Sequence, residues 1–429
     1  MRKNVMEITR SDAVVCIKKG EARALKAGGS WIYDNEIESV RGSYENGSIV
    51  AVQDFDGYPL GFGVLNNCSK IRIRMLSRYR SEAPDEKFLR SRVQAAWDYR
   101  KTVLQPQDLG ACRLIFGEAD WLPGIVIDRY EDVLVIESLS LGMDCLKRLI
   151  LEALLEILAA DQIRIRAVYE RSDAPVRKKE GMQPFKGLLY LDGVWFLSEN
   201  GTIAAAPGDF DPHVEITENG IHYIVDVQNG QKTGFFLDQK YNRLAMQRIC
   251  RGKKVLDCFT HMGTFALNAG LAGATQVTGL DISAFAVEQA RANAALNGLS
   301  ATVSFRCANV LDELPRLYAA GESFDVVILD PPAFTKSREA TKNAIKGYRE
   351  INMKGLKLVR DGGYLATCSC SHFMTQELFT RTIGEAARSV HKRLRQVEFR
   401  TQAPDHPILW ASDESYYLKF FIFQVCEEK

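Results

Sequence analysis

Two short segments of the sequence combine side chains that could carry out chemistry. The first, residues 325–334, is an apolar run that leads into Asp330-Pro331-Pro332. Two consecutive prolines cannot continue a strand, and they fix the backbone that follows. We therefore expect Asp330 to be held at the carboxyl end of a buried strand, where ligands bind in doubly wound sheets. An edge turn with a helix-capping aspartate is the simpler alternative.

The second segment, residues 367–372, places Cys368 and Cys370 at the end of another strand. Free cysteines are often inert core residues, but a thiolate at this edge could act as a nucleophile. Strand alternation puts both cysteines on one side, so one can be buried while the other is presented. We favour Cys370, which is nearer the rim, and Cys368 is the rival. His372 and His406 are candidates for lowering the pKa of the thiol.

These groups suit chemistry on a nucleobase. In methyltransferases an Asp-Pro-Pro-aromatic segment grips a planar base: the acid, here Asp330, accepts from an exocyclic amine and the aromatic ring stacks. A cysteine serves methylation of cytosine, because C5 becomes nucleophilic only after a thiolate adds at C6. The C5 proton then leaves and the cysteine is eliminated.

A nucleotide-binding unit precedes both segments, at residues 253–281. A strand ends at Asp257, a turn contains Gly263, a helix follows, and a second strand ends at Asp281. This βαβ pattern predicts a ligand with a ribose, whose hydroxyls donate to the terminal acid. A dinucleotide would need more glycines, so S-adenosylmethionine fits better. The unit by itself leaves that reading and an ordinary tight turn about even.

We expect Asp281 to hold the ribose, Phe259 and Gly263 to lie on the methionine side, and Ile282 and Asn309 to contact the adenine. A loop at residues 229–243 precedes the unit and could fold over the ligand, although a plain capping loop ending at Asp238 explains it as well. The predicted cofactor-binding residues are Thr233, Gly234, Phe235, Asp257, Phe259, Gly263, Asp281, Ile282 and Asn309.

Composition limits the remaining choices. The 429 residues suffice for two or three domains, and the formal net charge of +1 makes no global case for nucleic acid. Ten cysteines without a Cys-x-x-Cys pair argue against disulfides and a zinc site, so we expect no metal. The N-terminus lacks the apolar core of a signal peptide, and no run is long enough to span a bilayer. We therefore expect a cytoplasmic protein.

The elements predict an α/β protein of three parts. Residues 1–80 read as a small β-rich domain, residues 81–210 as a small central α/β domain, and residues 211–429 as a Rossmann-like sheet with alternating strands and helices. The last two strands have no helix between them, which predicts an antiparallel hairpin typical of methyltransferases. In the first domain, alternation puts Lys70, Arg72 and Arg74 on one strand face, which could contact RNA or only solvent.

With these residues in view, the chain resembles the bacterial 23S rRNA cytosine-C5 methyltransferases of the RlmI type over nearly its whole length. The matching segments are Lys19-Gly-Glu-Ala-Arg23, Leu122-Pro-Gly-Ile-Val-Ile-Asp-Arg129, Arg171-Ser-Asp173, Val176-Arg-Lys-Lys-Glu-Gly-Met182, Lys232-Thr-Gly-Phe-Phe-Leu-Asp238, Asp330-Pro-Pro332, Ser369-Cys-Ser371, Asp405-His-Pro407 and Tyr417-Leu-Lys419. Two positions depart from the family. Gly263-Thr264 stands where two glycines are common, and Asn309 stands where an acid is usual.

The resemblance implies an N-terminal PUA domain, S-adenosylmethionine as cofactor, and Cys370 as the cysteine of the Ser-Cys-Ser motif. It implies 23S rRNA as the partner, with Lys70, Arg72 and Arg74 in contact with phosphate groups. Neither a membrane nor DNA is an expected partner, and a homodimer is possible.

Two alternatives remain. One is an RNA N-methyltransferase of guanine or adenine, which needs no cysteine. The other is an RNA-binding ribosome assembly factor without catalysis.

Overall fold

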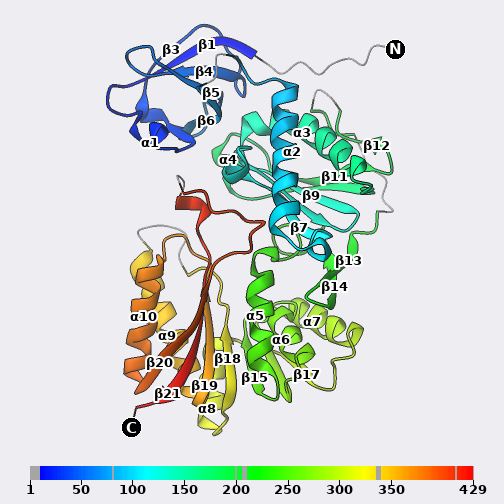
Figure 1. Ribbon diagram of the computed structural model, residues 1–429, viewed down its shortest axis with the longest axis vertical. Coiled ribbons are helices and arrows are strands. Elements are labelled where there is room, and N and C mark those ends of the chain that lie inside the picture. Colours follow the sequence, from blue (N-terminus) through cyan, green and yellow to red (C-terminus); the bar gives the residue numbers. More distant parts are fainter. Residues whose placement is uncertain are drawn as a thin grey trace. The chain divides into compact units, whose positions relative to one another are not determined.

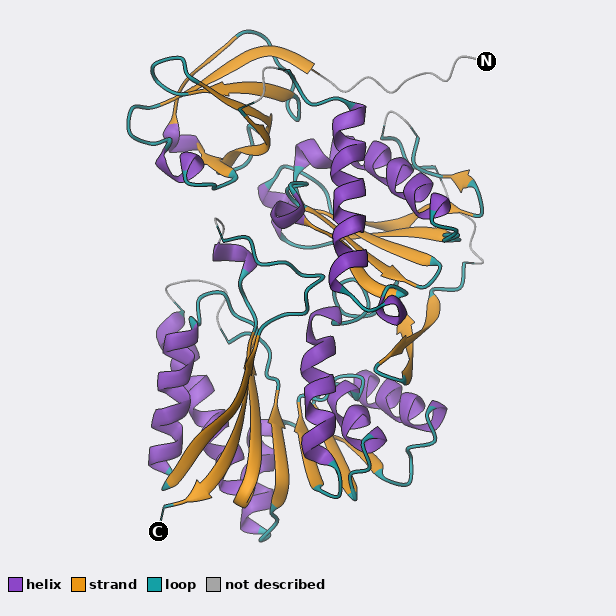
Figure 2. Ribbon diagram, viewed as in Figure 1, coloured by secondary structure: helices purple, strands orange, loops and turns teal. Residues whose placement is uncertain are grey.

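The computed structural model describes residues 10–79, 82–198, 201–204, 210–334, 340–410 and 413–428. The chain forms two compact units, of which the first comprises Met1–Ile216, Val225–Leu237 and Pro404–Ser415. The second comprises Thr217–Ile224, Asp238–Ala403 and Tyr416–Lys429. Figure 1 labels the elements and Figure 2 distinguishes helices from strands. Within the described residues, no helix has both the length and the apolar character needed to cross a bilayer.

The first unit begins with a six-stranded sheet in the order β2-β6-β5-β4-β1-β3. Its apolar side chains alternate along the strands, and Val15, Val50 and Ile73 are fully buried in one core. The turn between β4 and β5 contains Gly57 at φ 85°. The elements are β1 (Arg10–Ile17), α1 (Arg23–Lys26), β2 (Trp31–Tyr33), β3 (Ile37–Arg41), β4 (Ile49–Gln53), β5 (Pro59–Leu65) and β6 (Ile71–Arg78).

A second six-stranded sheet in the same unit has the order β12-β11-β10-β9-β8-β7. Two long helices that contact each other, α2 and α3, accompany it. Asp85 caps α2, because its side chain accepts from the backbone N–H of Phe88 at 2.8 Å. The elements are α2 (Glu86–Val103), β7 (Ala111–Phe116), β8 (Ile125–Tyr130), β9 (Val133–Ser138), α3 (Leu141–Ala160), β10 (Ala167–Ser172), α4 (Val176–Lys179), β11 (Phe185–Leu191) and β12 (Val194–Trp195).

The second unit is built on a seven-stranded sheet in the order β17-β16-β15-β18-β19-β21-β20. The strands from β17 to β19 pair in parallel, whereas β21 is antiparallel to both neighbours. The elements are α5 (Lys240–Cys250), β15 (Lys254–Cys258), α6 (Thr264–Leu271), β16 (Gln276–Asp281), α7 (Ala284–Leu296), β17 (Val303–Cys307), α8 (Val310–Ala319), β18 (Phe324–Leu329), α9 (Thr341–Leu358), β19 (Val359–Ser369), α10 (Gln376–Ser389), β20 (Lys392–Arg400) and β21 (Lys419–Glu427).

This topology confirms the predicted α/β fold, including the antiparallel hairpin that closes the sheet. The parallel strands β15, β16 and β18 carry residues such as Val255, Val277 and Val326 that are fully buried, as expected for strands covered on both faces. A separate pair, β13 (His213–Glu218) and β14 (Ile221–Asp226), forms a two-stranded sheet. The β-rich and central sheets lie in one compact unit, so the boundaries near residues 80 and 210 remain a prediction.

Candidate active site

Asp257 is the last residue but one of the central strand β15 and is completely buried. Its Oδ2 accepts from the Thr260 hydroxyl at 2.5 Å and from the backbone N–H of Ala266 at 3.0 Å. Its Oδ1 is buried without a hydrogen-bond partner in the described part of the chain. Burial raises the pKa of Asp257 to about 7, and the charges of Asp330 and Asp281 add to the effect. A buried carboxylate oxygen without a partner is suited to a donor or cation supplied by a ligand.

The turn after Asp257 has an unusual backbone. Phe259, His261 and Gly263 all have positive φ, at 63°, 52° and 85°. Left-handed residues other than glycine cost energy and gather at functional sites. A side chain at Gly263 would also lie 2.7 Å from the ring of Phe305. The glycine is therefore required by the backbone and by packing within the protein, and not solely by the approach of a ligand.

Asp281 ends β16 and holds the neighbouring turns. Its Oδ2 accepts from the backbone N–H of His261, and its Oδ1 from that of Ser283, both at 2.9 Å. Two apolar side chains beside it are unusually exposed, Ile282 at 71% and Phe285 at 54%. A carboxylate flanked by exposed apolar groups suits a ligand with both a ribose and a planar base. Phe285 was not predicted, since an aromatic residue in a helical pattern normally indicates core.

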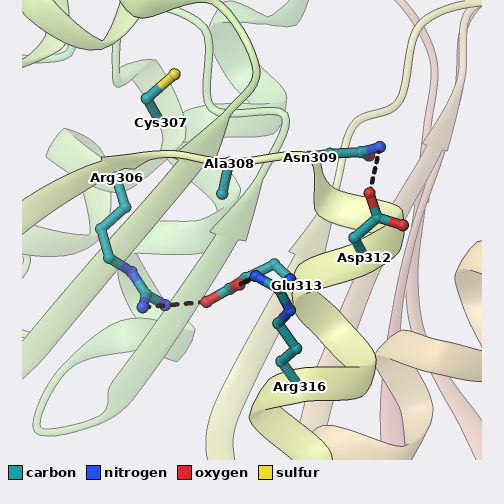
Figure 3. A pocket seen from close by; sticks show the side chains of 7 residues that line it. All are labelled: Arg306, Cys307, Ala308, Asn309, Asp312, Glu313 and Arg316. Carbon is teal, nitrogen blue, oxygen red and sulfur yellow. Dashed lines mark hydrogen bonds and ion pairs between the residues drawn. The ribbon is translucent and has the colours of Figure 1, made fainter.

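Asn309 lies in a hollow of about 340 Å³ beyond the end of β17 (Figure 3). Its Oδ1 accepts from the backbone N–H of Leu311 at 3.1 Å and caps α8, while its Nδ2 donates to Asp312 at 2.8 Å. The predicted adenine-contacting amide is thus oriented by an adjacent carboxylate. The hollow is lined by Arg306, Cys307, Ala308, Asn309, Asp312, Glu313 and Arg316.

Asp330 follows β18, as predicted, and its carboxylate meets two polar groups. Its Oδ2 accepts from Gln239 Nε2 at 3.2 Å, and the Cys368 thiol donates to the carboxylate. Burial raises the pKa of Asp330 to about 6, with a further contribution from Asp238. Above neutral pH the carboxylate is therefore largely ionised and can accept hydrogen bonds. Gln239 was not predicted, because residues 239 and 330 are brought together only by the fold.

The two cysteines differ in their surroundings. Cys368 is completely buried, and its sulfur lies 3.6 Å from Gln239 Nε2. Burial, reinforced by the charge of Asp330, raises the pKa of the Cys368 thiol well above its ordinary value. Cys370 lies just beyond the end of β19 and is half-buried. Of the two, Cys370 has the access that a nucleophile needs.

A buried lysine lies beside Cys370. Lys419 pairs with Ser369 across strands β19 and β21, and its Nζ donates to the carbonyl of Ser371 at 2.6 Å and of Tyr417 at 2.8 Å. Burial lowers the pKa of Lys419 to about 8, whereas the nearby Cys370 thiol acts in the opposite direction. Tyr417-Leu-Lys419 belongs to the family pattern, but its spacing did not indicate a role next to the cysteine.

Neither histidine predicted beside the thiol is shown to approach it. His406 belongs to the first unit, where its Nδ1 lies 2.9 Å from the carboxylate of Asp405 and its ring packs on Phe116. His372 packs edge-on against Phe373 at 5.1 Å between ring centres. A cationic group in electrostatic range of Cys370 is instead Lys419.

The aromatic residue after the two prolines also packs within the protein. The ring of Phe334 lies 4.8 Å from that of Tyr348 at an angle of 71°. Tyr348 in turn accepts from the Ser369 hydroxyl at 3.0 Å, which joins α9 to the end of β19. Stacking of Phe334 on a base remains a prediction.

The predicted loop over the cofactor belongs to the first unit. Thr233 is completely buried, and its hydroxyl donates to Asp128 at 2.6 Å and lies 3.0 Å from the hydroxyl of Tyr130. Phe235 is also buried, and its N–H donates to Tyr130. The loop that contains Gly234 is thus anchored to strand β8. A contribution of these residues to cofactor binding remains a prediction.

The basic face predicted on strand β6 is wrong for Arg74. This side chain is buried and forms ion pairs with Glu118 at 3.3 Å and Glu180 at 3.0 Å. Strand alternation places residues on one side, but it does not show what covers that side. Arg72 is half-buried and pairs with Asp34. Of the three predicted phosphate contacts, Lys70 alone is exposed.

Comparisons with known proteins agree with this site. A family model described as an S-adenosylmethionine-dependent methyltransferase matches residues 205–423, and a PUA-like domain model matches residues 15–78. A putative S-adenosylmethionine-dependent methyltransferase from Streptococcus mutans has the same fold, with a TM-score of 0.76 over 96% of this chain and 99% of that one at 21% identity. A putative methyltransferase solved with SAH gives 0.77 at 19% identity and the same coverage. The chain is therefore an S-adenosylmethionine-dependent methyltransferase with a PUA-like domain.

Sequence relatives narrow this class. Ribosomal RNA large subunit methyltransferase I of Shewanella denitrificans is 39% identical over 95% of this chain and 98% of its own length. The protein of that name from Alteromonas mediterranea is 34% identical over 97% of this chain and all of its own length. The chain belongs to the ribosomal RNA large subunit methyltransferase I family, which confirms the resemblance.

The site fits S-adenosylmethionine, the cofactor of this family. Asp257 offers a buried carboxylate oxygen that has no partner among the described residues, which suits the ammonium of a methionine moiety. Asp281 offers a carboxylate between exposed apolar side chains, which suits a ribose and an adenine. The individual contacts of these residues with the cofactor remain predictions.

Proposed function

We propose that the protein methylates C5 of a cytosine in large-subunit ribosomal RNA through a covalent bond to Cys370. The observation that supports this most directly is the half-buried Cys370 beside the Lys419 ammonium, with Asp330 at the end of the adjacent strand β18. The relatives at 34–39% identity are named for ribosomal RNA of the large subunit, which supports the choice of substrate.

In the proposed reaction the Lys419 ammonium stabilises the thiolate of Cys370, which attacks C6 of the cytosine. Asp330 accepts a hydrogen bond from the exocyclic amine and holds the base. The addition makes C5 nucleophilic, and bound S-adenosylmethionine supplies an electrophilic methyl group. Loss of the C5 proton to a base re-forms the double bond and expels Cys370 as thiolate. The base must leave its stack to reach the thiol, so the substrate RNA should be locally open.

Asp330 and Cys368 have a supporting role in this proposal. The thiol of Cys368 donates to the carboxylate of Asp330, and Gln239 Nε2 donates to Oδ2 of the same carboxylate at 3.2 Å. These two donors restrict the rotation of the carboxylate and favour its ionised form. The carboxylate is then prepared to accept from an amine, whereas a neutral acid would compete as a donor.

A mechanism-based trap tests the proposal. RNA that carries 5-fluorocytosine has no C5 proton to lose, so the enzyme should remain attached to it after methyl transfer. Gel electrophoresis under denaturing conditions should show this adduct for the wild type and for Cys368→Ala. The variant Cys370→Ala should give none.

Other outcomes would select the alternatives. An adduct that requires Cys368 and survives without Cys370 would reverse the two cysteines. Methyl transfer that continues in the absence of both cysteines would identify an amine-methylating enzyme. Tight RNA binding without methyl transfer would indicate a non-catalytic assembly factor.

A further inference from the structure

Exposed aromatic side chains gather on the β-rich domain, at the turn between β4 and β5 and just after β6. Tyr58 is 55% exposed and Tyr79 57%, and Phe55 beside them is 43% exposed. Tyr58 and Tyr79 border an open hollow of about 820 Å³. We call this the aromatic hollow; it is lined by Lys26, Asp54, Asp56, Gly57, Tyr58, Pro59 and Tyr79. Large apolar surface that is left exposed in one place commonly marks a binding site.

Hydrogen bonds fix the turn that carries Tyr58. Asp54 Oδ1 accepts from the backbone N–H of Asp56 at 3.1 Å and of Tyr58 at 2.9 Å. Asp54 Oδ2 accepts from Lys26 Nζ at 2.8 Å, which ties the turn to helix α1. The ring of Tyr58 is therefore presented on a prepared loop, and little conformational entropy is lost when a ligand binds.

The geometry of the rings suits a planar ligand. The centres of Tyr58 and Tyr79 lie 6.4 Å apart, and their planes meet at 60°. Each of the two tyrosine residues is more than half exposed, so the pair leaves aromatic surface uncovered. The Lys26 ammonium lies 5.9 Å from the centre of Tyr58 and contributes a cation at the edge of the hollow.

The charges that line the aromatic hollow disfavour the binding of a phosphate group there. Lys26 is neutralised by its ion pair with Asp54, and Asp56 adds a further negative charge to the lining. A phosphate would be repelled here, whereas carboxylates accept hydrogen bonds from the amino groups of bases. Aromatic surface combined with a carboxylate such as that of Asp56 is the chemistry that recognises an unpaired base.

We propose that the aromatic hollow binds an unpaired nucleobase of the substrate RNA, which stacks on one of the rings of Tyr58 and Tyr79 and meets the other at an angle. This inference rests on the proposed function, since that function supplies the RNA. It assigns RNA contact to a surface other than the basic strand, where Arg74 is buried in ion pairs. The hollow would anchor the RNA through a base, while phosphate contacts elsewhere supply the salt-dependent part of the affinity.

The test is binding of a fluorescent single-stranded rRNA fragment to the full-length protein at several salt concentrations. Stacking on an aromatic side chain is worth about 1–3 kcal/mol per base, so Tyr58→Ala and Tyr79→Ala should each raise the Kd by roughly 5- to 150-fold. The slope of log Kd against log salt should stay the same, because no phosphate contact is lost. Tyr58→Phe keeps the ring and should retain most of the affinity.

Several controls separate this inference from the proposed function. Thermal melting and S-adenosylmethionine binding should be unchanged in the tyrosine variants, and saturating RNA should still give the 5-fluorocytosine adduct. A Kd within twofold of the wild type, or a smaller salt slope, would overturn the inference alone. Unaltered RNA affinity with weaker binding to ribosomal particles would assign the hollow to a protein partner and overturn it as well. If wild-type protein binds no RNA, both proposals fail.

Discussion

Replacing Lys419 by methionine should make Cys370 a much poorer nucleophile. Methionine keeps the length and apolar volume of the side chain but removes its charge. The Lys419 ammonium is buried, so the surrounding solvent screens its attraction for a Cys370 thiolate only weakly. Two opposite unit charges about 5 Å apart in a medium with an effective dielectric constant of about 20 attract each other by about 3 kcal/mol, and we use this value as an order of magnitude.

The Lys419 ammonium also donates hydrogen bonds to the carbonyl groups of Ser371 and Tyr417. These bonds already stabilise part of its charge, so the net effect on the Cys370 thiolate is smaller. We therefore expect the pKa of the Cys370 thiol to rise by roughly 1–2 units in Lys419→Met, within the range for removal of a neighbouring opposite charge. The fraction of thiolate at neutral pH, and with it the rate of alkylation, should fall by roughly 10- to 100-fold.

Alkylation by iodoacetamide measures this effect without RNA. The rate at Cys370 should be followed by peptide mass spectrometry between pH 5 and 10, with Lys419→Arg as the matched control that keeps the charge. Among the described residues, Tyr348 and Cys368 also interact electrostatically with Cys370, and burial raises the pKa of both. Both groups should stay neutral through most of this range, so the change in charge comes mainly from Lys419.

The pH dependence provides a second check. Because the pKa of Lys419 is about 8, its ammonium is lost as the pH rises through that value. The wild type should therefore be alkylated at Cys370 faster than Lys419→Met. The ratio of the two rates should be largest below pH 8 and should fall above it. Identical pH profiles for the wild type and Lys419→Met would refute the reasoning, as would an equal loss in Lys419→Arg.

Three further predictions follow from the buried charges. Asp281→Ala should weaken binding of S-adenosylmethionine by about 1–3 kcal/mol in isothermal titration; unchanged affinity would remove the ribose assignment. Asp257 has its pKa raised to about 7, so the cofactor-free protein should lose stability as the pH rises from about 4 to 7, by up to about 4 kcal/mol. In melting experiments at pH 5 and pH 8, Asp257→Asn should lose less stability between the two pH values than the wild type does. An equal loss of stability in both proteins would contradict the prediction. Arg74→Ala should lower the free energy of unfolding by about 3–5 kcal/mol because it leaves buried carboxylates unpaired, whereas Arg72→Ala should change it by less than about 1 kcal/mol; equal effects in denaturant titrations would contradict the assignment.

The sequence was informative wherever an apolar run ends at a polar residue. Asp281 terminates its strand and Asp257 lies one residue before the end of its strand, and both positions could be predicted from chain order alone. Element boundaries were less predictable where charges mask the pattern. Strand β20 covers Lys392–Arg400 at the edge of the sheet, and an edge strand carries charged residues that blur its apolar alternation.

Partners from distant parts of the chain could not be predicted in this way. Alternation predicts that Lys70, Arg72 and Arg74 share one face, but Arg74 meets a carboxylate that lies 106 positions away in the sequence. Lys419 meets the carbonyl of Ser371 because β21 returns antiparallel to β19 and places residue 419 opposite residue 369. Local pattern shows the direction of a side chain, whereas tertiary packing decides what it touches.

The same distinction explains why two cysteines separated by one residue are suited to different tasks. Cys368 is still inside strand β19, where Asp330 and Gln239 surround its sulfur and a negative charge opposes ionisation. Cys370 lies past the strand, half-buried beside the ammonium of Lys419, where a positive charge favours ionisation. Since nucleophilic attack requires a thiolate, these electrostatics support the proposal that Cys370 is the attacking group. Cys368 is then best placed to keep the Asp330 carboxylate oriented, so its loss should impair base binding more than formation of the covalent bond.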